Sequence, residues 1–219
     1  MPKSAKEIKC LAKAAKITSG IFRTVVKQIK PGSREIEIAR SIEGIIKKKA
    51  LKRSFRIIVA SGPNAAKPHA KVTGRKIKSN DVVVVDFGVI YGGYHSDMTR
   101  TVMVGKADFA MRKLYNTVED AQKMAIRKLR PGLRISDFVR SIHDYIRRMG
   151  LGRYIMHSLG HGIGKKVHEA PKLSEKNKRI LKERTVVTIE PGLYMKKRSG
   201  VRIEDMVLIG KSGARVLTG

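Results

Sequence analysis

Three of the chain's six histidines lie in one short stretch, YIMHSLGHGIGKKVHEAP, residues 154–171. They are His157, His161 and His168, and glycines are interspersed among them. Imidazole side chains ligate transition metals and exchange protons near neutral pH. The stretch therefore predicts a metal site or a catalytic site, unless the histidines are ordinary surface or core residues. The acidic residues elsewhere in the chain help to decide between these interpretations.

Carboxylates occur beside apolar, strand-like runs. Asp86 ends the run VVVVD and Glu190 ends TVVTIE, while Asp97 and Glu204 lie on or beside two further runs. A carboxylate at the end of an apolar strand is costly unless a metal ion, a proton or a cation compensates its charge. Four carboxylates and His161 fit two divalent cations. Oxygen-rich ligation with a single imidazole favours Mn²⁺, Co²⁺ or Fe²⁺ over a structural zinc site.

Ion pairing within the protein is the alternative explanation for these acids. Arg100 follows Asp97 by three residues, and Arg202 precedes Glu204 by two. Such a pair would explain any one acid taken alone. Four acids and a histidine in similar settings favour the metal interpretation.

Helical and strand patterns indicate which elements would carry these residues. Apolar residues recur at helical spacing across 5–30, IKPG at 29–32 ends that helix, and a second helical pattern starts at Arg34. Runs rich in β-branched residues and bounded by glycine or proline predict strands at 55–60, 82–94, 99–105, 184–192 and 201–210. Helices combined with a mostly antiparallel sheet indicate an α+β domain.

The sequence also repeats at an offset of 100 residues. IKPG at 29–32 returns as LRPG at 129–132, and the helical pattern after it returns as well. The residues that meet the same type 100 positions later are Pro31, Gly32, Arg34, Arg40, Ser41, Ile42, Ile46 and Leu51. We infer two related halves, which would form a cleft where a small ligand binds.

Length and cysteine content limit the class of protein. A chain of 219 residues fits a single domain, and no run of apolar residues is long enough for a membrane span. The start, MPKSAKEIKC, lacks the apolar core of a secretory signal, and the single cysteine, Cys10, excludes an internal disulfide. These features predict a cytoplasmic protein without a membrane partner, and they leave the oligomeric state open.

The charge is strongly basic, with 48 Lys and Arg against 18 Asp and Glu and a formal net charge of +30. A surface this basic attracts polyanions, so association with RNA or the ribosome is one prediction. Only five phenylalanines are present, which leaves little aromatic surface for stacking bases. Diffuse charge without a dedicated partner is the alternative.

An ordered set of motifs resembles the pita-bread metallopeptidases, which include methionine aminopeptidase, aminopeptidase P and prolidase. The motifs are DFG, YHSDMTRT, HSLGHGIGKKVHEAP, TIEPGLY and GVRIED, and the resemblance extends to about residue 210. It implies the pita-bread (creatinase/aminopeptidase) fold, with two pseudo-symmetric αβ halves around a curved antiparallel sheet. By position it implies two divalent metal ions bound by Asp86, Asp97, His161, Glu190 and Glu204. Mn or Co is favoured over Fe or Zn.

The resemblance also implies metal-assisted peptide hydrolysis. Glu190 would take the proton of the attacking water and pass it to the leaving nitrogen. His157 and His168 would face the substrate and stabilise the developing oxyanion, with His69 of SGPNAAKPHA as a third. Arg202 would orient ligand carboxylates and lie beside the substrate.

The stretch SGPNAAKPHA, His157 and GVRIED resemble the branch that cleaves Xaa-Pro bonds. The leading prediction is therefore an aminopeptidase or dipeptidase for Xaa-Pro bonds, with a peptide as substrate. Removal of an initiator methionine is the first alternative, and a ribosome- or RNA-associated binding protein is the second. Because the first helix is expected from about residue 5, we expect one catalytic domain, 1–219, without the N-terminal creatinase-like domain.

Other motif interpretations fail on context. DFG at 86–88 occurs in kinases, but no HRD-type catalytic loop precedes it. GHGIGKK lacks the spacing of a phosphate-binding loop, and no HExxH zinc motif is present.

Overall fold

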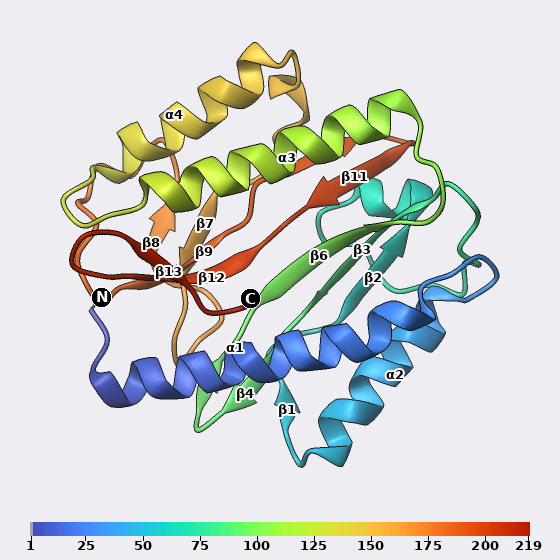
Figure 1. Ribbon diagram of the computed structural model, residues 1–219, viewed down its shortest axis with the longest axis horizontal. Helices are drawn as coiled ribbons and strands as arrows, with labels where there is room; N and C mark the ends of the chain where they lie inside the picture. The colour runs from blue at the N-terminus through green and yellow to red at the C-terminus, as the bar shows by residue number, and fades with distance from the viewer. Residues whose placement is uncertain (1) are drawn as a thin grey trace.

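Helix pairs packed on antiparallel strands form each half of the molecule (Figure 1). The computed structural model describes residues 2–219. The first half contains α1 (Ala5–Val25), α2 (Glu35–Lys48), β1 (Lys52–Arg53), β2 (Ile58–Ser61), β3 (Val82–Phe87), β4 (Val89–Tyr91), β5 (Tyr94–His95) and β6 (Met98–Met103). The second contains α3 (Phe109–Lys128), α4 (Ile135–Arg148), β7 (Gly160–Gly162), β8 (Glu169–Leu173), β9 (Val186–Ile189), β10 (Gly192–Met195), β11 (Ser199–Arg202), β12 (Asp205–Ile209) and β13 (Ala214–Val216).

The strands of residues 2–219 form four sheets. The first half has two three-stranded sheets, with the orders β2-β3-β6 and β1-β4-β5. The second half has a five-stranded sheet with the order β13-β12-β9-β7-β8 and the hairpin β10-β11. Every strand pair in the described part of the chain is antiparallel, which confirms the predicted α+β class.

The first helix begins with a capping box. The Ser4 hydroxyl accepts a bond from the Glu7 amide at 3.2 Å, and the Glu7 carboxylate accepts one from the Ser4 amide at 2.9 Å. These bonds satisfy amides that a helix start leaves free. The α-helix ends at Val25 and continues as a 3₁₀ turn, Val26–Gln28, so the predicted helix 5–30 is regular over most of its length.

The sequence repeat corresponds to a repeated turn. Gly32 has φ +92° and Gly132 has φ +85°, a region that glycine reaches without strain. The Gly32 amide donates to the Ile77 carbonyl, and the Gly132 amide donates to the Leu181 carbonyl, both at 2.9 Å. The two turns therefore enter α2 and α4 in the same way, which confirms the two related halves.

Two predicted strands are each divided in the structure. The run 82–94 becomes β3, β4 and β5: Gly88, whose backbone lies against the Ser96 carbonyl, separates β3 from β4, and a turn at Gly92 and Gly93, both with positive φ, separates β4 from β5. The run 201–210 becomes β11 and β12, with Ile203 and Glu204 between them. The predictions at 55–60, 99–105 and 184–192 match β2, β6 and β9 with shifted ends.

Each half has its own apolar core. Buried side chains of α1 and α2 pack with those of β3, including Ile42 and Val85, and buried side chains of α3 and α4 pack with β9 and β12, including Leu114 and Val207. Val186 of β9 and Met206 of β12 lie on the opposite face of the larger sheet and pack with Leu11 and Ala15 of α1, which joins the two halves. Within residues 2–219, no helix combines the length and apolar character needed to span a bilayer.

Candidate metal centre and substrate pocket

The five predicted metal ligands come from both halves and line a single pocket. Asp86 lies in β3 and Asp97 lies between β5 and β6, both in the first half. His161 lies in β7, Glu190 directly follows β9, and Glu204 lies between β11 and β12. The fold thus gathers residues that are up to 118 positions apart in the sequence (86 to 204).

Glycines allow β7 to lie very close to its neighbours. A Cβ at Gly160 would overlap the Thr188 carbonyl, and one at Gly162 would overlap the Ala170 carbonyl. The His161 amide donates to the Thr188 hydroxyl at 3.1 Å. The predicted glycine-rich turn is therefore a short, tightly paired strand that fixes the position of His161.

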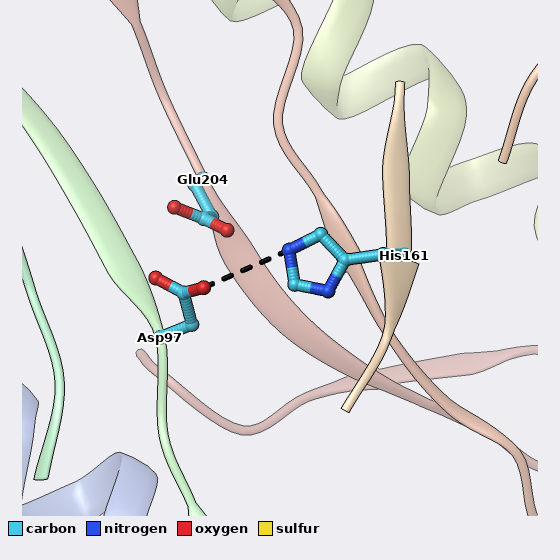
Figure 2. Close-up of side chains that lie close together, drawn as sticks. All are labelled: Asp97, His161 and Glu204. Carbon is cyan, nitrogen blue, oxygen red and sulfur yellow. Dashed lines mark ion pairs between the residues drawn. The ribbon is translucent and has the colours of Figure 1, made fainter. Parts of the chain in front are cut away.

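The imidazole of His161 faces the acidic cluster through Nε2 (Figure 2). Its Nδ1 donates to the Gly162 carbonyl at 3.0 Å, which leaves Nε2 as an acceptor. Nε2 lies 3.7 Å from an oxygen of Asp97 and 3.4 Å from one of Glu190. Figure 2 shows Asp97, Glu204 and His161 pointing toward one another from separate strands and loops. This is the orientation that a metal-ligating imidazole requires.

The cluster has the free ligand atoms that a divalent cation needs. One ligand atom each from Asp97, His161 and Glu204 lies within 4.8 Å of the others. Asp86 Oδ1 and Glu204 Oε1 are buried and have no hydrogen-bond partner. Among the described residues, Arg202 is the one arginine or lysine that pairs with any of the four acids, and it binds Asp86. Unpaired buried carboxylates of this kind fit divalent cations.

Burial and crowding change the protonation of these groups. Burial raises the pKa of Asp97 and of Glu204 well above the ordinary values, and repulsion from neighbouring carboxylates raises both further. Burial also raises the pKa of Asp86, and it raises that of Glu190 to about 7. For His161, burial lowers the pKa to about 4, so the imidazole is neutral near pH 7. Metal binding would therefore displace protons from the carboxyls.

Arg202 connects several parts of the site. Its guanidinium donates to Asp86 at 2.5 Å, to the Tyr194 hydroxyl at 2.7 Å, to the Pro68 carbonyl at 3.0 Å and to the Thr99 hydroxyl at 3.1 Å. A buried, planar guanidinium with this many acceptors is held in one orientation. The prediction that Arg202 orients ligand carboxylates agrees with its contact to Asp86.

His157 is bound by the protein at both ring nitrogens. Its Nδ1 donates to the Ser158 carbonyl at 2.8 Å, and its Nε2 accepts a bond from the Tyr194 hydroxyl at 2.8 Å. Burial lowers the pKa of His157 to about 4 and raises that of Tyr194 to about 12, so both groups are neutral near pH 7. The contact of His157 with substrate stays a prediction and requires that Tyr194 release Nε2.

The pocket in front of the cluster has a volume of about 840 Å³. His69 and His168 line it and are exposed. The ring of His168 lies edge-on to that of His161, with centroids 4.3 Å apart. Phe55 and Ile58 add apolar surface to the same pocket. A substrate in this space would therefore meet two accessible imidazoles and an apolar wall.

Three site residues were not identified from the sequence: Thr99, Thr188 and Tyr194. The Thr99 hydroxyl donates to Glu204 at 2.7 Å, and that of Thr188 lies 3.3 Å from Glu190. Strand alternation offers a signal for Thr188, since it precedes Glu190 by two positions and residues two apart share a face. Tyr194 lies in the quoted motif TIEPGLY, but its contact with His157 joins residues 37 positions apart.

Comparisons with known proteins agree with this geometry. The chain is 40% identical over 217 residues to a Xaa-Pro dipeptidase of Pyrococcus furiosus, a match that covers 99% of this chain and 62% of that protein. The structure of prolidase from Pyrococcus furiosus matches with a TM-score of 0.97 and 39% identity, covering 100% of this chain and 65% of that one. Aminopeptidase P from E. coli matches with a TM-score of 0.91 and 28% identity, covering 99% and 56%.

These likenesses confirm the predicted pita-bread fold. The chain spans about 62% of the length of the curated relatives it matches. Residues 9–211 match the model of metallopeptidase family M24. All five predicted metal ligands lie within this matched range. The predicted resemblance is confirmed, and the chain belongs to metallopeptidase family M24.

Proposed function

We propose that this chain carries the site of a dinuclear-metal exopeptidase that hydrolyses N-terminal Xaa-Pro bonds. The observation that carries the proposal is the convergence of four carboxylates and one imidazole from both halves in one substrate-sized pocket. The names of the relatives, Xaa-Pro dipeptidase and aminopeptidase P, favour proline-directed cleavage over removal of an initiator methionine.

The metal ions would be held by Asp86, Asp97, His161, Glu190 and Glu204, with manganese or cobalt as the first candidates and iron or zinc as the second. An oxygen-rich donor set with one imidazole supports the first pair. Bound divalent ions would supply a water of lowered pKa and polarise the scissile carbonyl.

The protein's own residues would position the substrate and transfer protons. Glu190, with a pKa of about 7, suits a group that accepts a proton from the attacking water and returns it to the proline nitrogen. His168 and His69 are exposed in the pocket and are free to donate to the carbonyl oxygen as it gains charge. Arg202 would hold the Asp86 carboxylate in place.

The apolar part of the pocket supports a proline on the leaving side. Phe55 and Ile58 line the same space as the histidines, and a pyrrolidine ring is stabilised by such contacts. The volume of about 840 Å³ accommodates more than one residue of a peptide.

Hydrolysis assays on metal-stripped protein resupplied with Mn²⁺ or Co²⁺ test the proposal. Matched peptides would begin Xaa-Pro or Met-Ala, and the His161→Ala variant would serve as control. We expect metal-dependent release of the residue before proline that the variant lacks. Cleavage of Met-Ala alone would support the methionine alternative, and cleavage of neither peptide despite bound metal would refute the proposal.

A second proposal concerns the charge of the chain. The outer face of α1 carries Lys6, Lys9, Lys13 and Lys16, which are exposed at helical spacing and form no ion pair within residues 2–219. This supports association with RNA or the ribosome in the cytoplasm, beside the peptidase activity. Co-sedimentation with ribosomes at low and high salt tests it, and absence of binding at low salt would refute it.

A further inference from the structure

Three basic side chains at the pocket have no role in the proposed chemistry. Arg56, Lys71 and Lys172 line the pocket and are exposed. None of the three forms an ion pair or a side-chain hydrogen bond with any residue in the range 2–219. We refer to these three residues as the basic rim.

The fold places the basic rim around the metal centre. Lys172 is the register partner of His161 across the β7-β8 pair, so both side chains lie on the same face of the sheet. Lys71 follows His69 by two positions, and Arg56 comes shortly before β2. The rim therefore approaches the pocket from both halves of the molecule.

Nearby acids do not neutralise the basic rim. Four of the five carboxylates that line the pocket belong to the metal cluster, whose charge bound divalent ions would balance. The fifth, Glu169, binds the buried ammonium of Lys3 at 2.6 Å and accepts a bond from the Lys166 amide. A peptide that extends out of the pocket would therefore meet a net positive charge.

We propose that the basic rim makes this site selective for peptides that carry an acidic residue shortly after the proline. The inference rests on the proposed Xaa-Pro peptidase function and specifies its substrate class. The rim side chains are long and flexible, so they would attract an acidic side chain of the peptide without requiring one fixed position for it. Exposed pairs of this kind change an equilibrium by about 1.4- to 5-fold each, and salt weakens them.

Three peptides that differ only in charge test the proposal. They are Ala-Pro-Glu, Ala-Pro-Gln and Ala-Pro-Lys, each with an amidated C-terminus, assayed for kcat/KM with the Mn²⁺-loaded protein. We expect the order Glu above Gln above Lys, with about 10-fold between the extremes at low salt, and a smaller ratio at high salt. Equal kcat/KM values for the three peptides would overturn the proposal.

Matched triple variants assign the effect to the rim. Arg56→Gln, Lys71→Gln and Lys172→Gln combined should bring the three peptides to similar kcat/KM, mainly through KM. The control combines Lys9→Gln, Lys13→Gln and Lys16→Gln on α1, which removes the same charge from residues that do not line the pocket and should keep the order. An order that persists in the rim variant would overturn the proposal.

A binding measurement separates this inference from the proposed function. Pro-Glu amide and Pro-Lys amide have no bond before proline to cleave, so calorimetry reports their affinity alone. Tighter binding of Pro-Glu amide to the wild-type protein than to the rim variant would support the rim even if no peptide is hydrolysed. Equal binding of both ligands to both proteins would overturn it. Loss of hydrolysis for all peptides would refute the peptidase proposal instead.

Discussion

The two halves share a turn and a helix start but differ in the buried side chain at the first helical position. In both, a glycine with positive φ leads into a helix, and the backbone amide at the helix start donates to a loop segment that forms an isolated β-bridge: Glu35 to the Arg75 carbonyl and Ile135 to the Arg179 carbonyl. The side chains then diverge. Ile135 packs in the apolar core of the second half, whereas Glu35 is a buried carboxylate.

Glu35 organises the loop that carries His69. Its two carboxylate oxygens accept bonds from the amide and hydroxyl of Ser61, the side chain of Asn64, and the amide and hydroxyl of Thr73. Because His69 lies between these donors in the sequence, the loop is tied at both ends. The shared scaffold therefore carries the predicted metal ligands, and the difference between the halves fixes a loop that lines the pocket.

The largest difference in stability between the two halves is expected for Glu35→Ala. The donors on Ser61 and Thr73 would lose their buried acceptor, which should lower the free energy of unfolding by about 3–5 kcal/mol. Ile135→Val at the matching position should cost about 0.5–1.5 kcal/mol, as a small deletion in a core does. Chemical denaturation measures both values. A similar loss in the free energy of unfolding at the two positions would show that the buried Glu35 does not stabilise the first half more than a core side chain does.

Substitutions of Asp86 and Glu190 compare a predicted metal ligand of the first half with one of the second half. Asp86→Asn and Glu190→Gln should each lower kcat/KM more than about 100-fold, because even outer partners of a metal contribute about 10- to 100-fold. Their metal-free stabilities should differ. Asp86→Asn leaves the buried Arg202 without its charge partner and should cost about 3 kcal/mol, whereas Glu190→Gln removes a carboxylate that is costly to ionise.

Thermal unfolding of the two metal-free variants at about pH 8, where the Glu190 carboxyl is mostly ionised, measures this difference. We expect Asp86→Asn to unfold at a lower temperature than wild type and Glu190→Gln to unfold at the same or a higher temperature. Equal destabilisation by both changes would contradict the distinct roles of the two acids.

Tyr194 tests the hydrogen bonds that hold His157 and Arg202 in place within the second half. Tyr194→Phe removes the donor to His157 and an acceptor of Arg202, while Phe keeps the apolar packing. The loss should lower kcat/KM about 2- to 10-fold, the range of single hydrogen bonds, with the bound metal content unchanged. Metal analysis together with kinetics checks this, and a loss of metal in Tyr194→Phe would place Tyr194 in the metal centre instead.

The smallest expected effect concerns pH. Folding raises the pKa of Glu190 from its ordinary value of 4.5 to about 7, so the metal-free fold loses stability as pH rises toward and through 7. Bound metal would compensate the charge of the ionised carboxylates. The increase in Tm caused by Mn²⁺ should therefore be larger at about pH 8 than at about pH 5.5. Each kcal/mol of difference in the free energy of unfolding corresponds to about 2–4 °C in Tm. An equal increase at both pH values would contradict the assignment.

The local patterns in the sequence predicted much of the scaffold. Pro31 and Gly32, with their counterparts 100 residues later, predicted both the turn and the two halves, because proline and glycine restrict or extend backbone conformation locally. Strand boundaries were less accurate. Gly88 lies between β3 and β4, where a Cβ would overlap the Ser96 carbonyl, and this close approach depends on the folded structure.

The site was predictable in its residue types and less so in its contacts. Four acids next to apolar strands indicated a metal centre, and the structure brings all five predicted ligands to one pocket. Tyr194 and Glu35 were missed because His157 and Ser61, with which they form hydrogen bonds, lie 37 and 26 residues away in the sequence. Long-range hydrogen bonds of this kind follow from the fold and leave no periodic signal.

The metal content of the chain tests the central claim most directly. Metal-stripped protein would be equilibrated with Mn²⁺, separated from free ions and analysed, with His161→Ala as the matched control. Four carboxylates and one imidazole predict two ions for each wild-type chain and fewer for the variant. Wild-type protein that retains no ion, or the same number of ions as His161→Ala, would contradict a dinuclear centre built from both halves.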